Sequence, residues 1–194
     1  GEGHGGIKRR LRAWKDYKEM DWKLPFFVSP QAIPLDKGGS VKHLITSIKA
    51  YKELPALVVV DTLATSFGSG DENSTKDMNT FLNHVQALRQ ALGCAVIVVH
   101  HTGHLAKERP RGAYALMAGV DAYYNIEKTE SGLTCLCSPG KMKDATPVKD
   151  TWFKTKSVKI GVDEDLEDIT SLVVEWQKNY QPPVGEKGLG TNQN

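Results

Sequence analysis

Two apolar stretches of the chain each end on polar side chains that can handle a phosphate group or a metal ion. Residues 57–60 end on Asp61, and residues 95–99 end on His100 and His101. Branched apolar runs without alternation are typical of strands that are buried on both faces of a parallel sheet. Because ligands bind beyond the carboxyl ends of such strands, we expect these polar groups on the ligand side of the sheet. The pattern predicts half of a nucleotide site, since these residues contain no phosphate-cradling GxxxxGK[ST] loop.

Asp61 and the histidine pair each allow more than one interpretation. A carboxylate at a strand end can hold Mg²⁺ through water beside nucleotide phosphates, or it can simply cap the turn that follows the strand. An imidazole at the neighbouring strand end can hydrogen-bond a γ-phosphate or the attacking water. We favour this sensing role for His100 and His101 over a core position, and a core position over metal binding. Adjacent strand residues point to opposite faces, so the pair is poorly placed to bind one metal ion.

Five further residues are weaker candidates for the same chemistry. Glu2 lies between two glycines and could act as a general base. Asp71 belongs to a polar triplet that is either a lead-in to a helix or part of a metal shell. Arg111 presents a forked donor suited to phosphate. Lys141 and Lys143 are expected at a loop tip, where basic residues are usually solvated but can also reach a neighbouring subunit's nucleotide.

The hydrophobic pattern predicts the elements that would place these side chains. We expect helices over residues 7–21, 41–52, about 76–92 and 113–119. We expect strands over residues 24–28, 56–61, 95–100, 121–127, 133–137, 151–160 and 169–176. The strand, helix and strand between residues 56 and 100 form a βαβ unit. Alternation in the final strands indicates antiparallel pairing on the sheet edge.

Local signals predict where two of these helices begin and end. Ser40 is the expected N-cap of the helix over residues 41–52, and Ser74 opens a capping box for the next helix. Gly93 is the expected stop of that second helix. Residues 64–75 are rich in Ser, Gly, Asp and Asn, which indicates a loop.

Composition restricts the class of protein. The chain has 194 residues, 40% of them hydrophobic and 25% charged, which is typical of a soluble globular domain. An odd count of three cysteines indicates reduced thiols and a cytoplasmic location. The net charge is only +2, but six basic residues crowd the first predicted helix: Lys8, Arg9, Arg10, Arg12, Lys15 and Lys18. Such a patch can meet a phosphate backbone, although a solvated helix face is the more common reason for any one of them.

Several motifs occur in one order over residues 1 to about 176. They are Gly1-Glu2-Gly3 with a basic helix ending in Ala13-Trp14, Val60-Asp61-Thr62-Leu63 with Gly70-Asp71-Glu72-Asn73, His100-His101-Thr102-Gly103, Arg111-Gly112 with Ala115-Leu116 and Asp121, and Lys141-Met142-Lys143-Asp144. Together they resemble the RecA-type AAA ATPases related to RepA, the hexameric replicative helicase of plasmids, and to phage and prophage helicase-primase proteins. His104 and Tyr114 depart from the Lys and Ser that this family often has.

The resemblance implies a fold and a set of roles. The implied fold is an α/β, RecA-like P-loop NTPase fold with a mostly parallel sheet, helices on both faces and antiparallel C-terminal edge strands, its first strand and P-loop absent. Asp61 is similar to the Walker B aspartate that holds Mg²⁺ through water, and Glu2 to the catalytic glutamate. His100 and His101 resemble sensor histidines. The implied nucleotide-binding residues are Thr62, Asp71, Arg111, Lys141 and Lys143.

The resemblance also implies cofactors, partners and a function. ATP and Mg²⁺ are the implied cofactors, and single-stranded DNA and a ring, expected to be a hexamer, are the implied partners. Residues 1–177 would be a partial ATPase domain and residues 178–194 a polar linker or disordered tail. The expected function is most of the motor domain of a replicative helicase, which would be inactive without its P-loop. There are two alternatives. The first is an ATP-binding regulator or helicase loader, and the second is a non-enzymatic nucleic-acid-binding or assembly module.

Overall fold

The computed structural model describes residues 4–21, 24–101, 111–128, 134–146, 150–178 and 180. These residues form two compact units, which are described separately. Unit 1 consists of the described residues between 29 and 120. Unit 2 consists of the described residues up to 28 and from 121 onward. None of the described helices is both long and apolar enough to cross a membrane.

Unit 1 is a parallel strand pair with helices. Its elements are α2 (Gly38–Lys49), β1 (Leu57–Asp61), α3 (Leu63–Ser66), α4 (Thr75–Leu92), β2 (Ala95–Val99) and α5 (Arg111–Gly119). β1 and β2 pair in parallel, with Leu57 opposite Ala95 and Asp61 opposite Val99. The expected βαβ unit is therefore confirmed, with strand limits within one residue of the prediction.

Helix α4 begins and ends at the residues that the sequence indicates. The side chain of Ser74 accepts a hydrogen bond from the backbone N–H of Asp77. Gly93 follows the helix in the left-handed conformation, with φ of 63°, and its N–H donates to the carbonyl of Arg89 at 2.9 Å. Glycine adopts this conformation without a steric penalty. It therefore ends the helix, and its N–H at the same time satisfies one of the terminal carbonyl groups.

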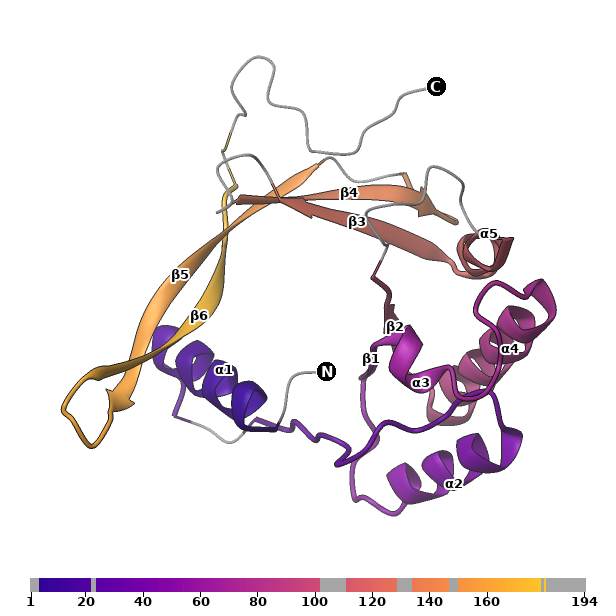
Figure 1. Cartoon of the computed structure of the whole chain (residues 1–194), viewed down its shortest axis with the longest axis horizontal. Coiled ribbons are helices and arrows are strands. Elements are labelled where there is room, and N and C mark those ends of the chain that lie inside the picture. The colour runs from indigo at the N-terminus through magenta and orange to yellow at the C-terminus, as the bar shows by residue number, and fades with distance from the viewer. Residues whose placement is uncertain are drawn as a thin grey trace. The chain divides into compact units, whose positions relative to one another are not determined.

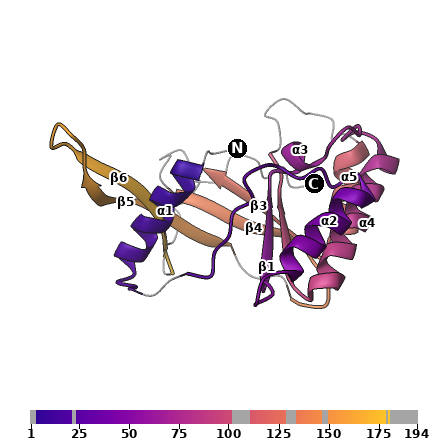
Figure 2. The same cartoon turned by 90° about the horizontal axis from the view of Figure 1, so that it is seen from below.

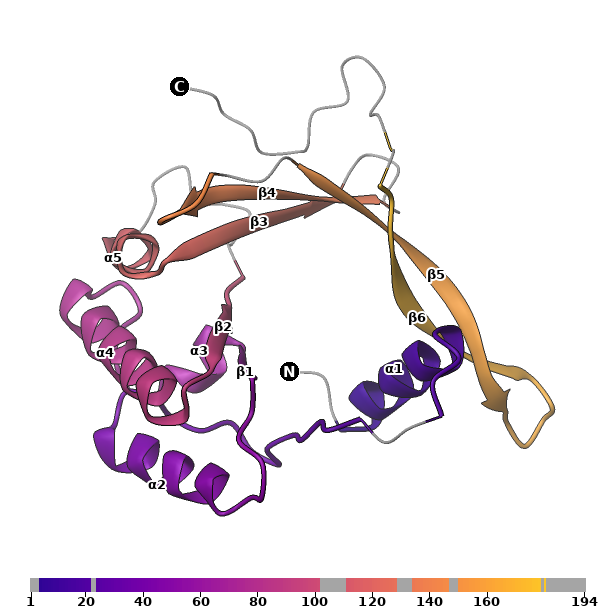
Figure 3. The same ribbon diagram turned by 180° about the vertical axis from the view of Figure 1, so that it is seen from behind.

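The core of unit 1 lies between one face of the parallel pair and its helices. Figures 2 and 3 show α2 and α4 on the same side of β1. Phe67 and Phe81 stack at the centre of this core with ring centroids 5.3 Å apart. The strand residues that pack against the core are Val58, Val60, Val96 and Val98. Cys94 is buried in the same region as a free thiol, as expected of a small core residue.

The opposite face of the strand pair is exposed, which corrects the prediction of strands buried on both faces. Leu57, Val59 and Ile97 keep 46%, 53% and 50% of their side-chain surface accessible. Alternate residues of a strand point to opposite faces, so helices on one face leave every second residue uncovered. The apolar run therefore indicated the strands correctly but overstated how much of each is covered.

Three further predictions for unit 1 are wrong in detail. Helix α2 begins at Gly38 with Lys37 as its N-cap and no side-chain capping bond, so Ser40 lies inside the helix. Residues 63–66, expected to lie mostly in a loop, form the short helix α3. Helix α2 ends at Lys49, so Tyr51, which lies within the predicted helix range of 41–52, follows the helix and is exposed. In the first two cases, helical backbone hydrogen bonds extend beyond the boundary that local composition suggests.

Unit 2 is an antiparallel sheet with one helix. Its elements are α1 (His4–Tyr17), β3 (Ala122–Lys128), β4 (Thr134–Met142), β5 (Thr151–Val162) and β6 (Asp168–Trp176). The strands pair in the order β3-β4-β5-β6. Figure 1 shows α1 along the long β5–β6 hairpin, and α1 contacts both of its strands. The α/β class, with parallel strands first and antiparallel C-terminal strands after them, is confirmed.

The details of unit 2 differ from the prediction in four ways. The antiparallel strands form their own sheet and do not extend the edge of the parallel pair. Strand β4 continues to Met142, into the expected loop, because its end pairs with the start of β3. Residues 24–28 form no strand. Helix α1 ends at Tyr17, four residues before the predicted limit of 21.

Candidate functional site

The parallel register brings the two main candidate groups to one end of the sheet. Asp61 is the last residue of β1 and pairs with Val99, the last residue of β2. His100 follows Val99 directly, so it lies one residue beyond the partner of Asp61. The side chains of Asp61, His100 and His101 are all exposed. The expected meeting of a carboxylate and an imidazole at the carboxyl ends of parallel strands is therefore confirmed as geometry.

Thr62, directly after Asp61, has a structural role. The peptide bond between the two residues is cis. The backbone N–H of Thr62 donates to Oγ1 of Thr65 at 2.9 Å, and Oγ1 of Thr62 accepts from the N–H of Thr65 at 3.4 Å. This reciprocal capping box begins α3 and buries the Thr62 side chain. A nucleotide-binding role for Thr62 stays a prediction.

Asp71 organises the turn before α4. Its Oδ1 accepts from the N–H of Asn73 at 2.9 Å, and its own N–H donates to Oδ2 of Asp77 at 3.1 Å. An aspartate that accepts from the backbone two residues ahead is a common turn device. The structure therefore shows the lead-in to a helix, which was one of the two interpretations of this residue, and a nucleotide-binding role stays a prediction.

The loop that follows Asp61 is held by Asp36, a residue that sequence reasoning missed. Oδ2 of Asp36 accepts from both the N–H and the Oγ of Ser69, each at 2.9 Å. These bonds lower the pKa of the Asp36 carboxyl below its ordinary value of 3.8, and the bond from the backbone N–H has the largest effect. Its Oδ1 is buried with no hydrogen-bond partner in the described part of the chain. No sequence spacing links residues so far apart, so only the folded chain could reveal this anchor.

Gly68 makes the approach of Asp36 to this loop possible. Its φ is +86°, a conformation that other residues rarely adopt. A Cβ at this position would also overlap the carboxylate of Asp36. Glycine is therefore required here for both the backbone conformation and the space.

The remaining sequence candidates are only partly described. Glu2 and the loop over residues 102–110 lie outside the described residues, and so does the side chain of Arg111, whose backbone begins α5. Lys141 lies within β4, opposite Tyr123, so its expected place in a loop is wrong. Lys143 follows β4; its N–H donates to the carbonyl of Asp121 at 2.9 Å, and its Nζ lies 3.3 Å from Oδ1 of the same residue. These contacts belong to unit 2, and the nucleotide roles of the two lysines stay predictions.

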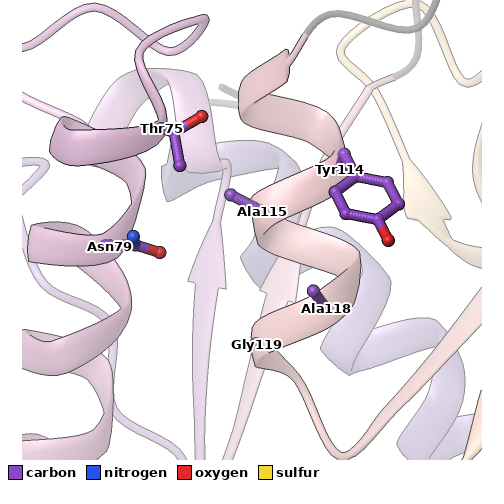
Figure 4. A pocket seen from close by; sticks show the side chains of 6 residues that line it. All are labelled: Thr75, Asn79, Tyr114, Ala115, Ala118 and Gly119. Carbon is purple, nitrogen blue, oxygen red and sulfur yellow. The ribbon is translucent and has the colours of Figure 1, made fainter.

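A shallow cavity of about 390 Å³ lies between α4 and α5 in unit 1. Its lining residues are Thr75, Asn79, Tyr114, Ala115, Ala118 and Gly119. Figure 4 shows Ala115 pointing toward α4 and the Tyr114 ring pointing away from it. The lining is mostly apolar and holds no ionisable group other than the tyrosine hydroxyl, so it supplies no residue for phosphate chemistry.

The oxygen chemistry at the end of β1 fits a magnesium ion. The described residues contain no group of three or more histidine, cysteine or acidic side chains that could enclose a metal. Mg²⁺ keeps several waters and commonly uses one or two carboxylates together with nucleotide phosphates. A single exposed carboxylate such as Asp61 is compatible with that mode of binding.

Three comparisons relate this chain to known proteins. A family model described as an AAA domain matches residues 1–107, slightly more than half of the chain. The chain is also similar to the crystal structure of the RadB recombinase, with 15% sequence identity over 75% of this chain and 68% of that chain, and a TM-score of 0.49. No curated protein sequence matches it. At this identity and TM-score the likeness to RadB identifies no function, and the family match is the informative comparison.

Proposed function

Because this chain belongs to the AAA domain family, we propose that it forms most of the ATP-hydrolysing motor domain of a helicase-type protein. The motor would couple ATP hydrolysis to translocation along nucleic acid, with single-stranded DNA as substrate and a ring, such as a hexamer, as the working assembly. The single observation that carries this proposal is the pairing of Asp61 with Val99, which places a carboxylate and the His100 imidazole at the same end of two parallel strands.

Asp61 would hold Mg²⁺ through a water molecule, and the ion would neutralise charge on the ATP phosphates when bound. The capping box of Thr62 holds the chain rigidly after Asp61, since it fixes the first turn of α3 against the end of β1. The hydrogen bonds of Asp36 fix the far end of the same segment. Rigid support of this kind is what positions a charged group for phosphoryl transfer.

His100 would hydrogen-bond either the γ-phosphate or the attacking water. Its imidazole is exposed beyond the end of β2, so it is accessible to a nucleotide bound beside Asp61. A neutral imidazole has one donor and one acceptor nitrogen and can therefore report whether the γ-phosphate is present. His101, Glu2 and Arg111 are proposed to act in the same reaction on the grounds of the motif resemblance.

The test is phosphate release by the intact encoded polypeptide, measured with and without single-stranded DNA. We expect stimulation by DNA, and a fall of at least about 100-fold in the Asp61→Asn variant, the scale seen when one charge-stabilising group is removed from an active site. Asp165→Asn, an exposed aspartate in the β5–β6 loop, is the matched control and should leave the rate unchanged. Equal rates in the two variants would refute the role of Asp61.

Two other results would favour one of the alternative functions over a helicase motor. ATP turnover that DNA does not change, without unwinding, would favour a regulator or helicase loader. Failure to bind ATP at all would favour a non-enzymatic nucleic-acid-binding or assembly module. Residues 1–194 by themselves contain no GxxxxGK[ST] loop, and we expect no turnover from this segment alone.

A further inference from the structure

A groove in unit 2 lies between helix α1 and strand β6, far from Asp61 in sequence. It has a volume of about 310 Å³. Its lining residues are Gly6, Arg9 and Arg10 from α1 and Thr170, Ser171 and Leu172 from β6. The lining thus contains two arginines and two residues with hydroxyl groups, and no residue with a carboxylate.

Two elements near this groove, α1 and β5, are basic, although the whole chain has a net charge of only +2. Helix α1 contains five lysine and arginine residues and one aspartate. Strand β5 contains three lysines and no acidic residue. Strand β6 contributes two acidic residues, Asp168 and Glu175. Positive charge is therefore concentrated on α1 and β5, which contact each other, while the loop between β5 and β6 carries four acidic residues: Asp163, Glu164, Asp165 and Glu167.

Both acidic residues of β6 are already engaged by neighbours on the same hairpin or on α1. Asp168 forms an ion pair with Lys159. Glu175 accepts a hydrogen bond of 2.7 Å from the hydroxyl of Tyr17 and lies 3.4 Å from Nζ of Lys156. Their charges are thus balanced outside the groove. Arg9 has no ion-pair partner among the residues that the structure describes.

We propose that this groove binds the phosphate backbone of single-stranded nucleic acid. Arginine forks and hydroxyl groups are the usual side-chain partners of phosphate oxygens. Basic residues continue along α1 and β5 beyond the groove, which suits a polymer with repeated charges better than a single phosphate ion. The choice of nucleic acid over another polyanion rests on the proposed motor function.

The test measures binding of a fluorescently labelled 30-nucleotide oligothymidine by fluorescence anisotropy over a series of salt concentrations, without ATP. We expect the double variant Arg9→Ala/Arg10→Ala to bind at least about tenfold more weakly. Loss of two phosphate contacts should also lower the slope of log K against log salt by about 1.4, since each contact to a single strand contributes about 0.7. Arg9→Lys/Arg10→Lys should restore most of the slope, because the charges return.

The matched control is Lys42→Ala/Lys49→Ala, which removes two exposed lysines from α2 in unit 1. This variant loses the same charge, so its affinity and slope should stay near those of the unmodified protein. Circular dichroism of each variant checks that the fold is retained. Equal losses in the two double variants would overturn the groove as the binding site. Displacement of the oligonucleotide by inorganic phosphate, beyond that by chloride at the same ionic strength, would also overturn it.

The binding test is independent of ATP hydrolysis. If Asp61→Asn leaves ATPase activity unchanged while Arg9→Ala/Arg10→Ala loses DNA binding, the motor assignment of Asp61 fails and the groove stands. If the arginine variant binds DNA normally while Asp61→Asn loses hydrolysis, the groove fails and the motor site stands. Binding of phosphatidylserine vesicles in place of the oligonucleotide would overturn the nucleic-acid assignment.

Discussion

Among the described residues, eleven hydrophobic side chains are buried in unit 1 and three in unit 2. In unit 1, helices cover one face of the parallel pair, and aromatic and aliphatic side chains from four helices and both strands pack together. In unit 2, one helix lies on a long hairpin, and the buried residues are Ala13, Trp152 and Val173. Leu172, Val174 and Trp176 alternate with Val173 on β6 and are exposed.

This contrast separates two ways of presenting charged groups. Unit 1 holds Asp61 and His100 at the ends of strands that a packed core fixes, which suits chemistry that requires exact positions within fractions of an ångström. Unit 2 presents arginines and lysines on the exposed surfaces of α1 and β5. Such a surface suits binding to a polymer, because contacts to phosphate tolerate variation in position and sequence.

The largest expected effect tests whether the core of unit 1 holds that unit together. Phe81 is fully buried against Phe67, so Phe81→Ala should lower the free energy of unfolding by about 3–5 kcal/mol. The measurement is urea unfolding followed by circular dichroism. Phe27→Ala, at a side chain that is 70% exposed, is the matched control and should change stability by less than about 0.5 kcal/mol. Similar losses in both variants would contradict the core as described.

A smaller effect is expected in unit 2, where two neighbouring valines on β6 differ only in their environment. Val173→Ala should cost about 2 kcal/mol, since it removes two buried carbon groups worth about 0.8 kcal/mol each and leaves a small cavity. Val174→Ala, on the exposed face, should cost much less. Hydrogen exchange of amides in β5 and β6 is the measurement. Equal protection in the two variants would show that α1 contributes no core to the hairpin.

The smallest effect concerns a partly buried contact between α1 and the hairpin. The hydrogen bond from Tyr17 lowers the pKa of Glu175 below its ordinary value of 4.5, and the nearby Lys156 adds a smaller effect in the same direction. A lowered pKa in the folded state means that this contact stabilises the protein above about pH 4.5 and that the contribution is lost as the pH falls through the folded-state pKa.

Tyr17→Phe should therefore raise the pKa of Glu175 part of the way toward 4.5, while Lys156 keeps the rest of the shift. NMR titration of the Glu175 carboxyl carbon in both proteins measures this change. The Tyr17 hydroxyl should show the reciprocal behaviour, since the carboxylate raises its pKa above 10.0. Identical titration curves for Glu175 in the two proteins would mean that the hydrogen bond does not persist in solution.

Part of the site could be predicted because its signals are local. The apolar run before Asp61 and the run before His100 each specify a strand, and the capped helix between them specifies a parallel crossover. Parallel pairing then places both strand ends at the same edge of the sheet, so their common location can be predicted without knowledge of the tertiary structure. Asp36, in contrast, contacts Ser69 across 33 positions, and no periodicity or spacing encodes that pair.

The sequence by itself determined most of the order of helices and strands, the caps of α4 and the common location of Asp61 and His100, because hydrogen bonding and periodicity act over a few residues. Only the tertiary structure decided that one face of the parallel pair is exposed and that the final strands form a separate sheet. It also placed Arg9 and Arg10 beside Thr170 and Ser171. Those features depend on which surfaces meet, and residues about 160 positions apart meet only when long-range packing brings a helix onto a hairpin.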